Sequence, residues 1–444
     1  MSAFKLHTLK QKLWAIVAAS FIARVIMFFA LPNTPSSLAP DEGTYAALAK
    51  WIAESKPAED FPLFGGDLYL SGRSLILPAS FFIKAGMYEL DAVRLVSTTY
   101  GIVSLTLIVV LVLRFYKELS PKSPNEVFNE NLIAALIFIF AFVPSHFMWS
   151  NLALRESATE FWILATFGVF LAVYHVQKKI TAPGILGLVM SIAFTFSSRP
   201  QVGWVIGVSL IAYLLFNLNQ INTYFLIGIV LCGVLLGSVW NQGSVLGSTG
   251  ASNTGANGTG ANGTDELKGI LNPLINGGEL VSSKHRGNQL NAASIIKTQS
   301  CPREKPSLTS TPPTKFDTYF CIAWRAPYMI STFLFRPIVG IDVTSTSSLL
   351  AALENLIWMS LFVFLFFLII RKRRISFLRS LLPPIVFFVF YVSGASAYQG
   401  NMGTGFRHKS LILWVVLLVI FALAWRKTES PEQNSRNNSQ ESAV

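Results

Sequence analysis

Two adjacent acidic residues, Asp41 and Glu42, are the first candidates for chemistry in this chain. They follow Pro40 and open the segment PDEGTYAALAKWIAE, in which apolar and aromatic residues recur at helical spacing. Proline suits the first turn of a helix, and carboxylates suit its positive N-terminal end. Stabilisation of a helix start would therefore explain the pair. A carboxylate near a membrane can also take a proton from an acceptor hydroxyl or amine, so both explanations stand.

A set of cations forms the second candidate group, because it gathers at one expected membrane interface. Its members are Arg73, Arg94, Arg155, Arg199, Arg407, His408 and Lys409, with Glu156 as an acidic neighbour. Arginine binds a phosphate through a bidentate fork, and lysine binds it as a point charge. For any one of these cations, contact with a lipid headgroup or a structural ion pair is an equally good explanation. Their origin in several different loops favours an anion-binding site.

The composition shows what must position these residues. The chain has 444 residues, of which 52% are hydrophobic and 13% are charged, and its mean hydropathy is +0.51. Soluble domains carry about 25% charged residues. Apolar runs of bilayer length recur without the alternation of barrel strands, which predicts an all-α polytopic membrane protein. The net charge of +12 suits basic cytoplasmic loops, so we expect no nucleic-acid partner.

About ten spans are expected. They cover residues 13–31, 93–113, 131–149, 159–176, 182–197, 202–216, 222–240, 346–370, 377–395 and 410–425. No small-residue cleavage site follows the first span, so we interpret it as a retained anchor. Basic residues fall in alternate short loops, and this bias predicts that both termini are cytoplasmic.

This topology divides the chain into four parts. Residues 1–240 form an N-terminal membrane module with a first outer loop at 32–91. Residues 241–345 form a second large outer loop, which contains a flexible Gly/Asn/Thr repeat at 249–264. Residues 346–425 form the last spans, and residues 426–444 form a disordered cytoplasmic tail.

The acidic pair directly after the first span, followed by a Tyr-Ala helix, resembles the start of GT-C superfamily glycosyltransferases. The protein O-mannosyltransferase and aminoarabinose transferase group is the most similar, and it shares the layout of two large outer loops. The layout covers most of the chain, whereas the specific match covers little more than Pro40 to Ala46. The resemblance implies a GT-C-like bundle and an inverting transfer of sugar from a polyprenyl phosphate.

The resemblance also implies roles for single residues. Asp41 would be the general base, and Glu42 would orient it or the acceptor. Position and charge alone assign the leaving lipid phosphate to Arg155, Arg199, Arg407, His408 and Lys409, and the donor or acceptor site to Tyr45, Arg73 and Glu156. No metal motif is present, although Asp41 and Glu42 leave room for a divalent cation. The acceptor would be a glycan, a lipid or a protein, and the location a bacterial inner membrane.

Other interpretations of the same residues are a lipid or solute transporter, a flippase, or an enzyme of the O-antigen polymerase or ligase type. A transporter predicts internal repeats, which the two halves do not show. Three further expectations concern structure. Arg24, within the first span, avoids lipid and has Glu354 as a conceivable partner. Cys301 and Cys321 can form a disulfide in the second outer loop. The stretch 326–340 is a re-entrant or interfacial helix, or the start of a longer span.

Overall fold

The computed structural model describes most of the chain. The described residues are 2–36, 39, 41–62, 65–119, 126–127, 130–173, 181–216, 221–242, 315–343, 346–372, 381–398, 402–424 and 426–427. The repeat at 249–264, Cys301, the disulfide, most of the second outer loop and the tail beyond 427 lie outside these residues.

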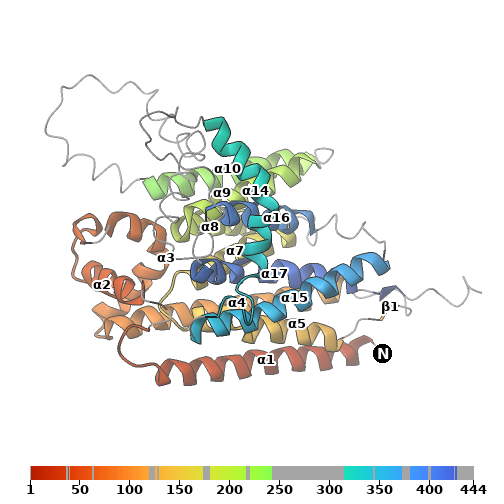
Figure 1. The fold of residues 1–444 in the computed structure, drawn as a ribbon, viewed down its shortest axis with the longest axis horizontal. Helices are drawn as coiled ribbons and strands as arrows, with labels where there is room; N and C mark the ends of the chain where they lie inside the picture. The colour runs from red at the N-terminus through yellow and green to blue at the C-terminus, as the bar shows by residue number, and fades with distance from the viewer. Residues whose placement is uncertain are drawn as a thin grey trace, which may run out of the picture.

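Within the described residues the fold is helical, apart from one short antiparallel pair, β1 (Glu126–Val127) with β2 (Arg426–Lys427). The helices are α1 (Ser2–Ala30), α2 (Asp41–Ala53), the 3-10 helix η1 (Ala58–Asp60), α3 (Gly65–Lys84), α4 (Glu89–Leu119), α5 (Glu130–Phe142), α6 (Pro144–Trp149), α7 (Glu156–Leu171), α8 (Ala182–Ser198), α9 (Pro200–Leu215), α10 (Ile221–Gln242), α14 (Lys315–Phe335), α15 (Thr346–Lys372), α16 (Leu382–Tyr398) and α17 (Met402–Ala424). Figure 1 shows that the axes of the long helices α1, α4, α15 and α17 are roughly aligned with one another.

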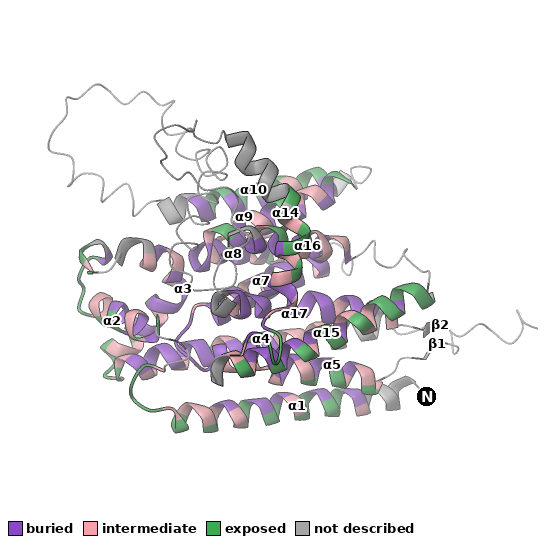
Figure 2. Ribbon diagram, in the orientation of Figure 1, coloured by how far each residue is buried: buried purple, intermediate pink, exposed green. Residues whose placement is uncertain are grey.

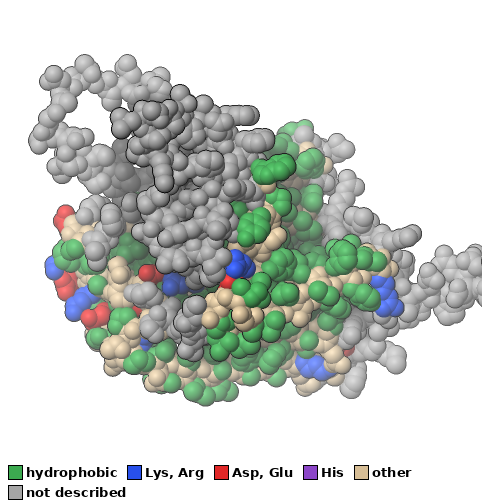
Figure 3. Space-filling model, in the orientation of Figure 1, with side chains coloured by type: hydrophobic (Ala, Val, Ile, Leu, Met, Phe, Trp, Pro, Cys, Tyr) green, Lys and Arg blue, Asp and Glu red, His purple; other side chains and the backbone are tan. Residues whose placement is uncertain are grey.

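Four described helices are long and apolar enough to cross a membrane. Their apolar segments are Thr8–Ala30, Glu89–Arg114, Ser348–Arg371 and Gly405–Ala424. Large hydrophobic side chains are exposed on α1, α4 and α15, including Phe29 on α1 and Phe366 on α15, whereas the segment of α17 is 83% buried. Figures 2 and 3 show these exposed faces and their hydrophobic cover. Since soluble monomers rarely expose apolar patches of this extent, the chain has the character of a membrane protein.

Described helices overlap each of the ten expected spans, and four of the overlapping segments are long and apolar enough to cross a membrane. Six shorter apolar helices accompany the four long ones: Glu130–Phe142, Ala182–Ser198, Pro200–Leu215, Thr223–Ser238, Ala326–Phe335 and Leu382–Ser396. The expected span 131–149 is broken into α5 and α6 at Val143, whose backbone is extended (φ −58°, ψ 132°). Pro144 causes this break, because a proline disfavours helical backbone in the residue before it.

The core is built around α7 and α17. Side chains of α17 such as Leu411 and Ile412 are fully buried, and α17 contacts α5, α6, α7, α15 and α16. Phe167 of α7 packs its ring against Phe387 and Trp414 at 5.3 Å in each case. Aromatic contacts of this kind stabilise the packing of α7 with α16 and α17.

Contacts group the loops at two ends of the bundle. At the end that holds the N-terminus, Thr8 of α1 donates to Glu130 of α5 at 3.0 Å, and β1 pairs with β2. The topology expected from the sequence puts these segments on one side of the membrane. The first outer loop and the starts of α7 and α17 meet at the other end (Figure 1).

The first outer loop folds onto the bundle through α2 and α3. The sequence pattern predicts the helix at α2. Tyr45 and Leu48 on its apolar side are buried in a second core cluster, where α2 packs against α3 and α4. Gly72 permits the close approach of α3, because a Cβ there would lie 3.2 Å from the Tyr45 ring. The apolar side of α2 is therefore covered by other parts of the protein.

The stretch 326–340 contains the end of a separate helix, α14, and the turn that follows it. α14 ends at Phe335, and a cis peptide bond joins Arg336 to Pro337. Arg336 then binds the carboxylate of Asp342 with two hydrogen bonds, of 2.9 and 2.6 Å. α15 begins only at Thr346, so the stretch is not the first part of that span.

Candidate functional site

The two adjacent carboxylates have different partners. Glu42 is fully buried and binds Arg94 of α4 with two hydrogen bonds, of 3.0 and 2.9 Å. Its oxygens also accept from the backbone N–H groups of Ser36 (2.7 Å) and Ala153 (2.8 Å). Because both oxygens are engaged by the protein, Glu42 ties α2 to α4 and to the segment before α7. This geometry favours a positioning role over contact with an acceptor.

Asp41 lies at the start of α2 and is open to solvent. Its side chain is 58% exposed, and its Oδ2 accepts a hydrogen bond of 2.8 Å from Arg407 at the start of α17. The Arg407 guanidinium in turn lies over the Trp149 ring, 5.4 Å from its centroid. This cation–π contact holds Arg407 at the rim of the bundle. The candidate base thus faces a candidate phosphate ligand that is 366 residues away in the chain.

Arg199 enters the site because of the proline that follows it. Pro200 opens α9, so Arg199 is held extended (φ −157°, ψ 100°) between α8 and α9. Its side chain donates to Glu156 at the start of α7 (2.6 Å) and contacts Nε2 of His408 on α17. Three helix starts therefore converge on one buried guanidinium group.

Arg155 and Tyr45 complete the site. Arg155 is half-buried and donates to the backbone carbonyl of Ser71 on α3 at 3.1 Å. It interacts electrostatically with Tyr45, Glu156 and His408. Tyr45 also interacts with the charges of Asp41 and Arg199, so its phenol lies among the members of the cluster. We call Asp41, Tyr45, Arg155, Glu156, Arg199, Arg407 and His408 the outer cluster.

The charges of the outer cluster decide which forms are present near neutral pH. Burial raises the pKa of the Tyr45 phenol, so it stays protonated and can donate a hydrogen bond. Burial alone would also raise the pKa of Glu156, but Arg199, Arg155 and Arg407 together lower it below its usual value. Glu156 is therefore an anion that orients arginines and a poor proton acceptor. Three guanidinium groups face two carboxylates, which leaves one positive charge over.

In the outer cluster, Oε2 of Glu156 and Nδ1 of His408 are buried and have no hydrogen-bond partner among the described residues. Buried polar atoms are nearly always paired with protein, water or a ligand. Both belong to side chains that contact Arg199. The cluster therefore has hydrogen-bonding capacity for a bound molecule.

Lys409 and Arg73 are placed differently from the outer cluster. The Lys409 amine is buried and donates to the backbone carbonyl of Arg336 (2.8 Å) and to Asn355 (2.6 Å). The amine also interacts electrostatically with Glu354. Lys409 thus joins α17 to α15 and to the turn after α14, and its hydrogen bonds go to protein groups. The helix turn separates it from His408, its neighbour in sequence. Arg73 stacks on the Tyr69 ring at 4.9 Å.

Arg24 avoids the surface as expected, and its hydrogen bonds do not go to Glu354, the partner considered for it. Arg24 is fully buried, as expected of a charge that avoids lipid, and it donates to Ser20 and to Ser150 (3.2 Å). Glu354 instead accepts from the backbone N–H of Ser145 at 2.5 Å and from Trp358 at 3.1 Å. Each charge therefore has one hydrogen-bond partner on its own helix and one in or directly after α6.

One buried pair escaped the sequence analysis. His146 of α6 and Glu160 of α7 lie 2.9 Å apart, and Glu160 is one helical turn below Glu156. Their position as ionisable residues inside apolar runs could have identified them from the sequence. Nothing in the sequence pattern indicated that Trp149 would contact Arg407.

The residues present do not fit a divalent cation. The two carboxylates expected to hold it bind separate arginines, Asp41 to Arg407 and Glu42 to Arg94. In the part of the chain that the structure describes, no three His, Cys, Asp or Glu side chains gather as metal ligands do.

Comparison with protein-family models, with curated proteins and with solved structures finds no match to this chain.

Proposed function

We propose that this protein is a membrane glycosyltransferase that moves a sugar from a polyprenyl-phosphate donor to an acceptor at the extracytoplasmic face. The observation that carries the proposal is the outer cluster at one end of an apolar helical bundle. There the solvent-open carboxylate of Asp41 pairs with Arg407, one of three arginines that interact with Glu156. A carboxylate can take the acceptor's proton, and arginines can stabilise a leaving phosphate. The resemblance of Pro40 to Ala46 to the GT-C superfamily agrees with these two roles.

The charge balance suits this donor. A sugar linked to a lipid through one phosphate is a phosphodiester with a single negative charge, and the outer cluster has one positive charge in excess. Once the sugar leaves, the phosphate becomes a monoester, which carries about −1.5 to −2 near neutral pH. The attraction of Arg155, Arg199 and Arg407 therefore grows as the reaction proceeds. Interactions that strengthen toward the transition state are those that accelerate a reaction.

The proposed step is a direct displacement at the anomeric carbon. The acceptor oxygen or nitrogen bonds to that carbon while the bond from carbon to phosphate oxygen breaks. Asp41 takes the acceptor's proton, and the lipid phosphate leaves with the bonding electrons. Attack opposite the leaving group inverts the anomeric configuration. A phosphate that recruits Arg407 would free the Asp41 carboxylate, which Arg407 holds in the structure at 2.8 Å.

The other residues act around this step. Glu156 orients Arg199 at 2.6 Å, and Tyr45 supplies a neutral phenol donor. His408 offers its unpartnered Nδ1 to the bound donor. Glu42, bound to Arg94, holds the start of α2 so that Asp41 faces the cluster.

The location follows from the same topology. Basic loop residues favour cytoplasmic termini, so the outer cluster faces the opposite side, which in a bacterium is the periplasm. Lipid-linked sugars on that side feed assembly of cell-envelope glycans and glycolipids. The acceptor class is a glycan, a lipid or a protein.

The test is sugar transfer by the full chain in liposomes that contain polyprenyl-phosphate sugars, followed by the release of polyprenyl phosphate. Wild type and Asp41→Asn are compared, with Asp60→Asn as a matched control, because Asp60 is an exposed carboxylate of the same outer loop. We expect transfer by wild type and Asp60→Asn and its loss in a folded Asp41→Asn. Transfer that survives in Asp41→Asn at the wild-type rate contradicts the assignment of the base.

A transporter or flippase is the second candidate, because Arg24, His146 and Glu160 are charged or ionisable groups buried deep in the bundle. It predicts that a labelled lipid-phosphate sugar crosses the bilayer and keeps its sugar. An O-antigen polymerase or ligase predicts transfer only from diphosphate-linked donors. Measuring donor breakdown and donor movement in the same liposomes separates the three.

A further inference from the structure

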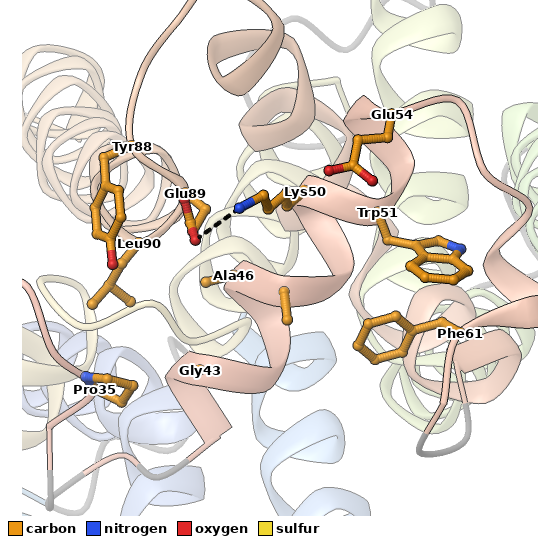
Figure 4. A pocket seen from close by; sticks show the side chains of 11 residues that line it. Pro35, Gly43, Ala46, Lys50, Trp51, Glu54, Phe61, Tyr88, Glu89 and Leu90 are labelled. Carbon is orange, nitrogen blue, oxygen red and sulfur yellow. Dashed lines mark hydrogen bonds and ion pairs between the residues drawn. The ribbon is translucent and has the colours of Figure 1, made fainter.

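A pocket separate from the outer cluster lies along α2, on the side away from Tyr45. It is open to solvent, has a volume of about 440 Å³, and is enclosed by α2, the start of α4, Pro35 and Phe61. Figure 4 shows Tyr88 at one side of it, Trp51 and Phe61 at the other, and the Lys50 amine reaching between them toward Glu89. Its volume lies within the range of small-molecule sites. No residue of the outer cluster lines it.

The charges of this pocket balance. Lys50 pairs with Glu89 at 3.4 Å, and Lys56 pairs with Glu54 at 2.6 Å. One cation, Lys50, and two anions, Glu54 and Glu89, line the pocket. Lys56 lies beside the lining residues and neutralises Glu54, so no net charge is left to select an ion. These pairs are exposed, with 51% of the Lys50 side chain open to solvent, so they are weak and can exchange partners with a ligand. The walls therefore offer many hydrogen-bond donors and acceptors to a neutral, polar molecule.

The aromatic side chains supply the remaining chemistry. Tyr88 is 46% exposed, and Trp51 packs edge-on with Phe61 at a centroid distance of 5.8 Å. Trp51 is held in place by a 2.7 Å hydrogen bond from its indole N–H to the carbonyl of Pro57. Fixed aromatic rings beside paired charges suit a molecule that is apolar on one face and hydroxylated at its edge. A sugar ring has that form.

We propose that the pocket of α2 binds a neutral saccharide, as the acceptor subsite of the proposed glycosyltransferase. The inference about the acceptor rests on the proposed function, whereas saccharide binding itself does not. Gly43 and Glu54 mark the two ends of the pocket along α2, and helical rise puts them roughly 16 Å apart. This length suits a short oligosaccharide better than one sugar unit.

The position of the pocket makes delivery to Asp41 direct. Gly43, in its wall, is two residues from Asp41, at the same end of α2. A chain bound along α2 would thus present its end near the start of the helix, where Asp41 and the outer cluster meet. The acceptor and the lipid donor would approach Asp41 from opposite sides of one helix.

Saturation-transfer NMR on the full chain in nanodiscs tests the binding, with cellotriose, chitotriose and mannotriose as probes. Ala47 is exposed and lines the pocket, so Ala47→Trp fills it without removing a contact. Ala85→Trp is the matched control, because Ala85 is an exposed alanine that does not line the pocket. We expect ring-proton signals from at least one probe with wild type and Ala85→Trp, and their loss with Ala47→Trp. No signal from any probe at millimolar concentration, or an equal signal with Ala47→Trp, overturns the proposal.

Two further measurements separate this inference from the proposed function. Asp41→Asn should keep the saccharide signal while it loses transfer. Ala47→Trp should raise the acceptor KM at least about tenfold and leave release of polyprenyl phosphate by hydrolysis unchanged. A saccharide signal in a protein that transfers no sugar refutes the glycosyltransferase and leaves the binding site standing. Normal acceptor KM in Ala47→Trp refutes the acceptor subsite alone.

Discussion

Two charged regions meet at the start of α2, and they differ in how completely their charges are satisfied. In the Glu42–Arg94 pair, both side chains are buried, and the carboxylate accepts four hydrogen bonds from Arg94 and two backbone N–H groups. In the outer cluster, Asp41 is 58% exposed, and atoms of Glu156 and His408 have no partner among the described residues. A saturated network gives stability, whereas an incomplete one can bind a ligand. The difference suggests that adjacent carboxylates have opposite tasks.

The sharpest test of this contrast is the rate of sugar transfer. Asp41→Asn should lower kcat by roughly 10²–10⁴-fold, the usual contribution of a general base. The free energy of unfolding should change by no more than about 1 kcal/mol, because the ion pair with Arg407 is exposed on the aspartate side. Transfer kinetics and chemical denaturation in detergent measure the two effects. A loss of activity that is fully accounted for by a loss of folded protein would show that Asp41 acts as a helix cap and not as a base.

Glu42→Gln should show the reverse pattern. It leaves the buried Arg94 without its counter-charge, which costs about 3–5 kcal/mol of unfolding free energy. Activity per folded molecule should fall far less than in Asp41→Asn, because Glu42 positions the start of α2 and both its oxygens are bound by protein groups. Denaturation of Glu42→Gln, Arg94→Met and the double variant measures the coupling, and the double variant should recover part of the loss. A stable Glu42→Gln without transfer would return Glu42 to a catalytic role.

The third test concerns donor binding by the outer cluster. Arg155→Gln removes one cation that is half-buried at the rim of the cluster. A hydrogen bond to a charged group contributes about 1.5–3 kcal/mol, so the donor KM should rise roughly 10–100-fold. Lys84→Gln is the control, since Lys84 is an exposed cation at the end of α3. Equal effects of both substitutions would indicate general surface charge and no phosphate site.

The smallest expected effect is in the pH dependence of stability. Because the pKa of Glu156 is lowered in the folded protein, its anion favours folding above the ordinary value near 4.5. This contribution is lost as the pH falls through the lowered folded pKa. The stability difference between wild type and Glu156→Gln should therefore shrink on acidification below about pH 4.5. A constant difference from neutral to acid pH would show that Arg199 does not depend on the Glu156 charge.

Local patterns were enough to predict most helices. Apolar runs, Pro40 before α2 and Pro200 before α9 each act over a few residues, and helices lie where these signals put them. The failures were long-range. The sequence predicted that Arg24 avoids lipid but could not identify its partner Ser150, which is 126 residues away and is reported by no sequence period. Lys409 follows two residues of the cluster in sequence, yet the helix turn directs it to Asn355.

The sequence by itself determined that this is a helical chain with membrane character, since composition and run length set the cost of exposing each segment to water or lipid. It also identified Asp41, Glu156, Arg199 and Arg407 as candidates, because charge is rare in such a chain. Only the tertiary structure decided which charges meet. Ion pairs depend on distances of 3–4 Å between helices that are far apart in the chain, and packing of α2, α7, α9 and α17 sets those distances. Adjacent residues such as Asp41 and Glu42 then diverge, since helix geometry points neighbours in different directions.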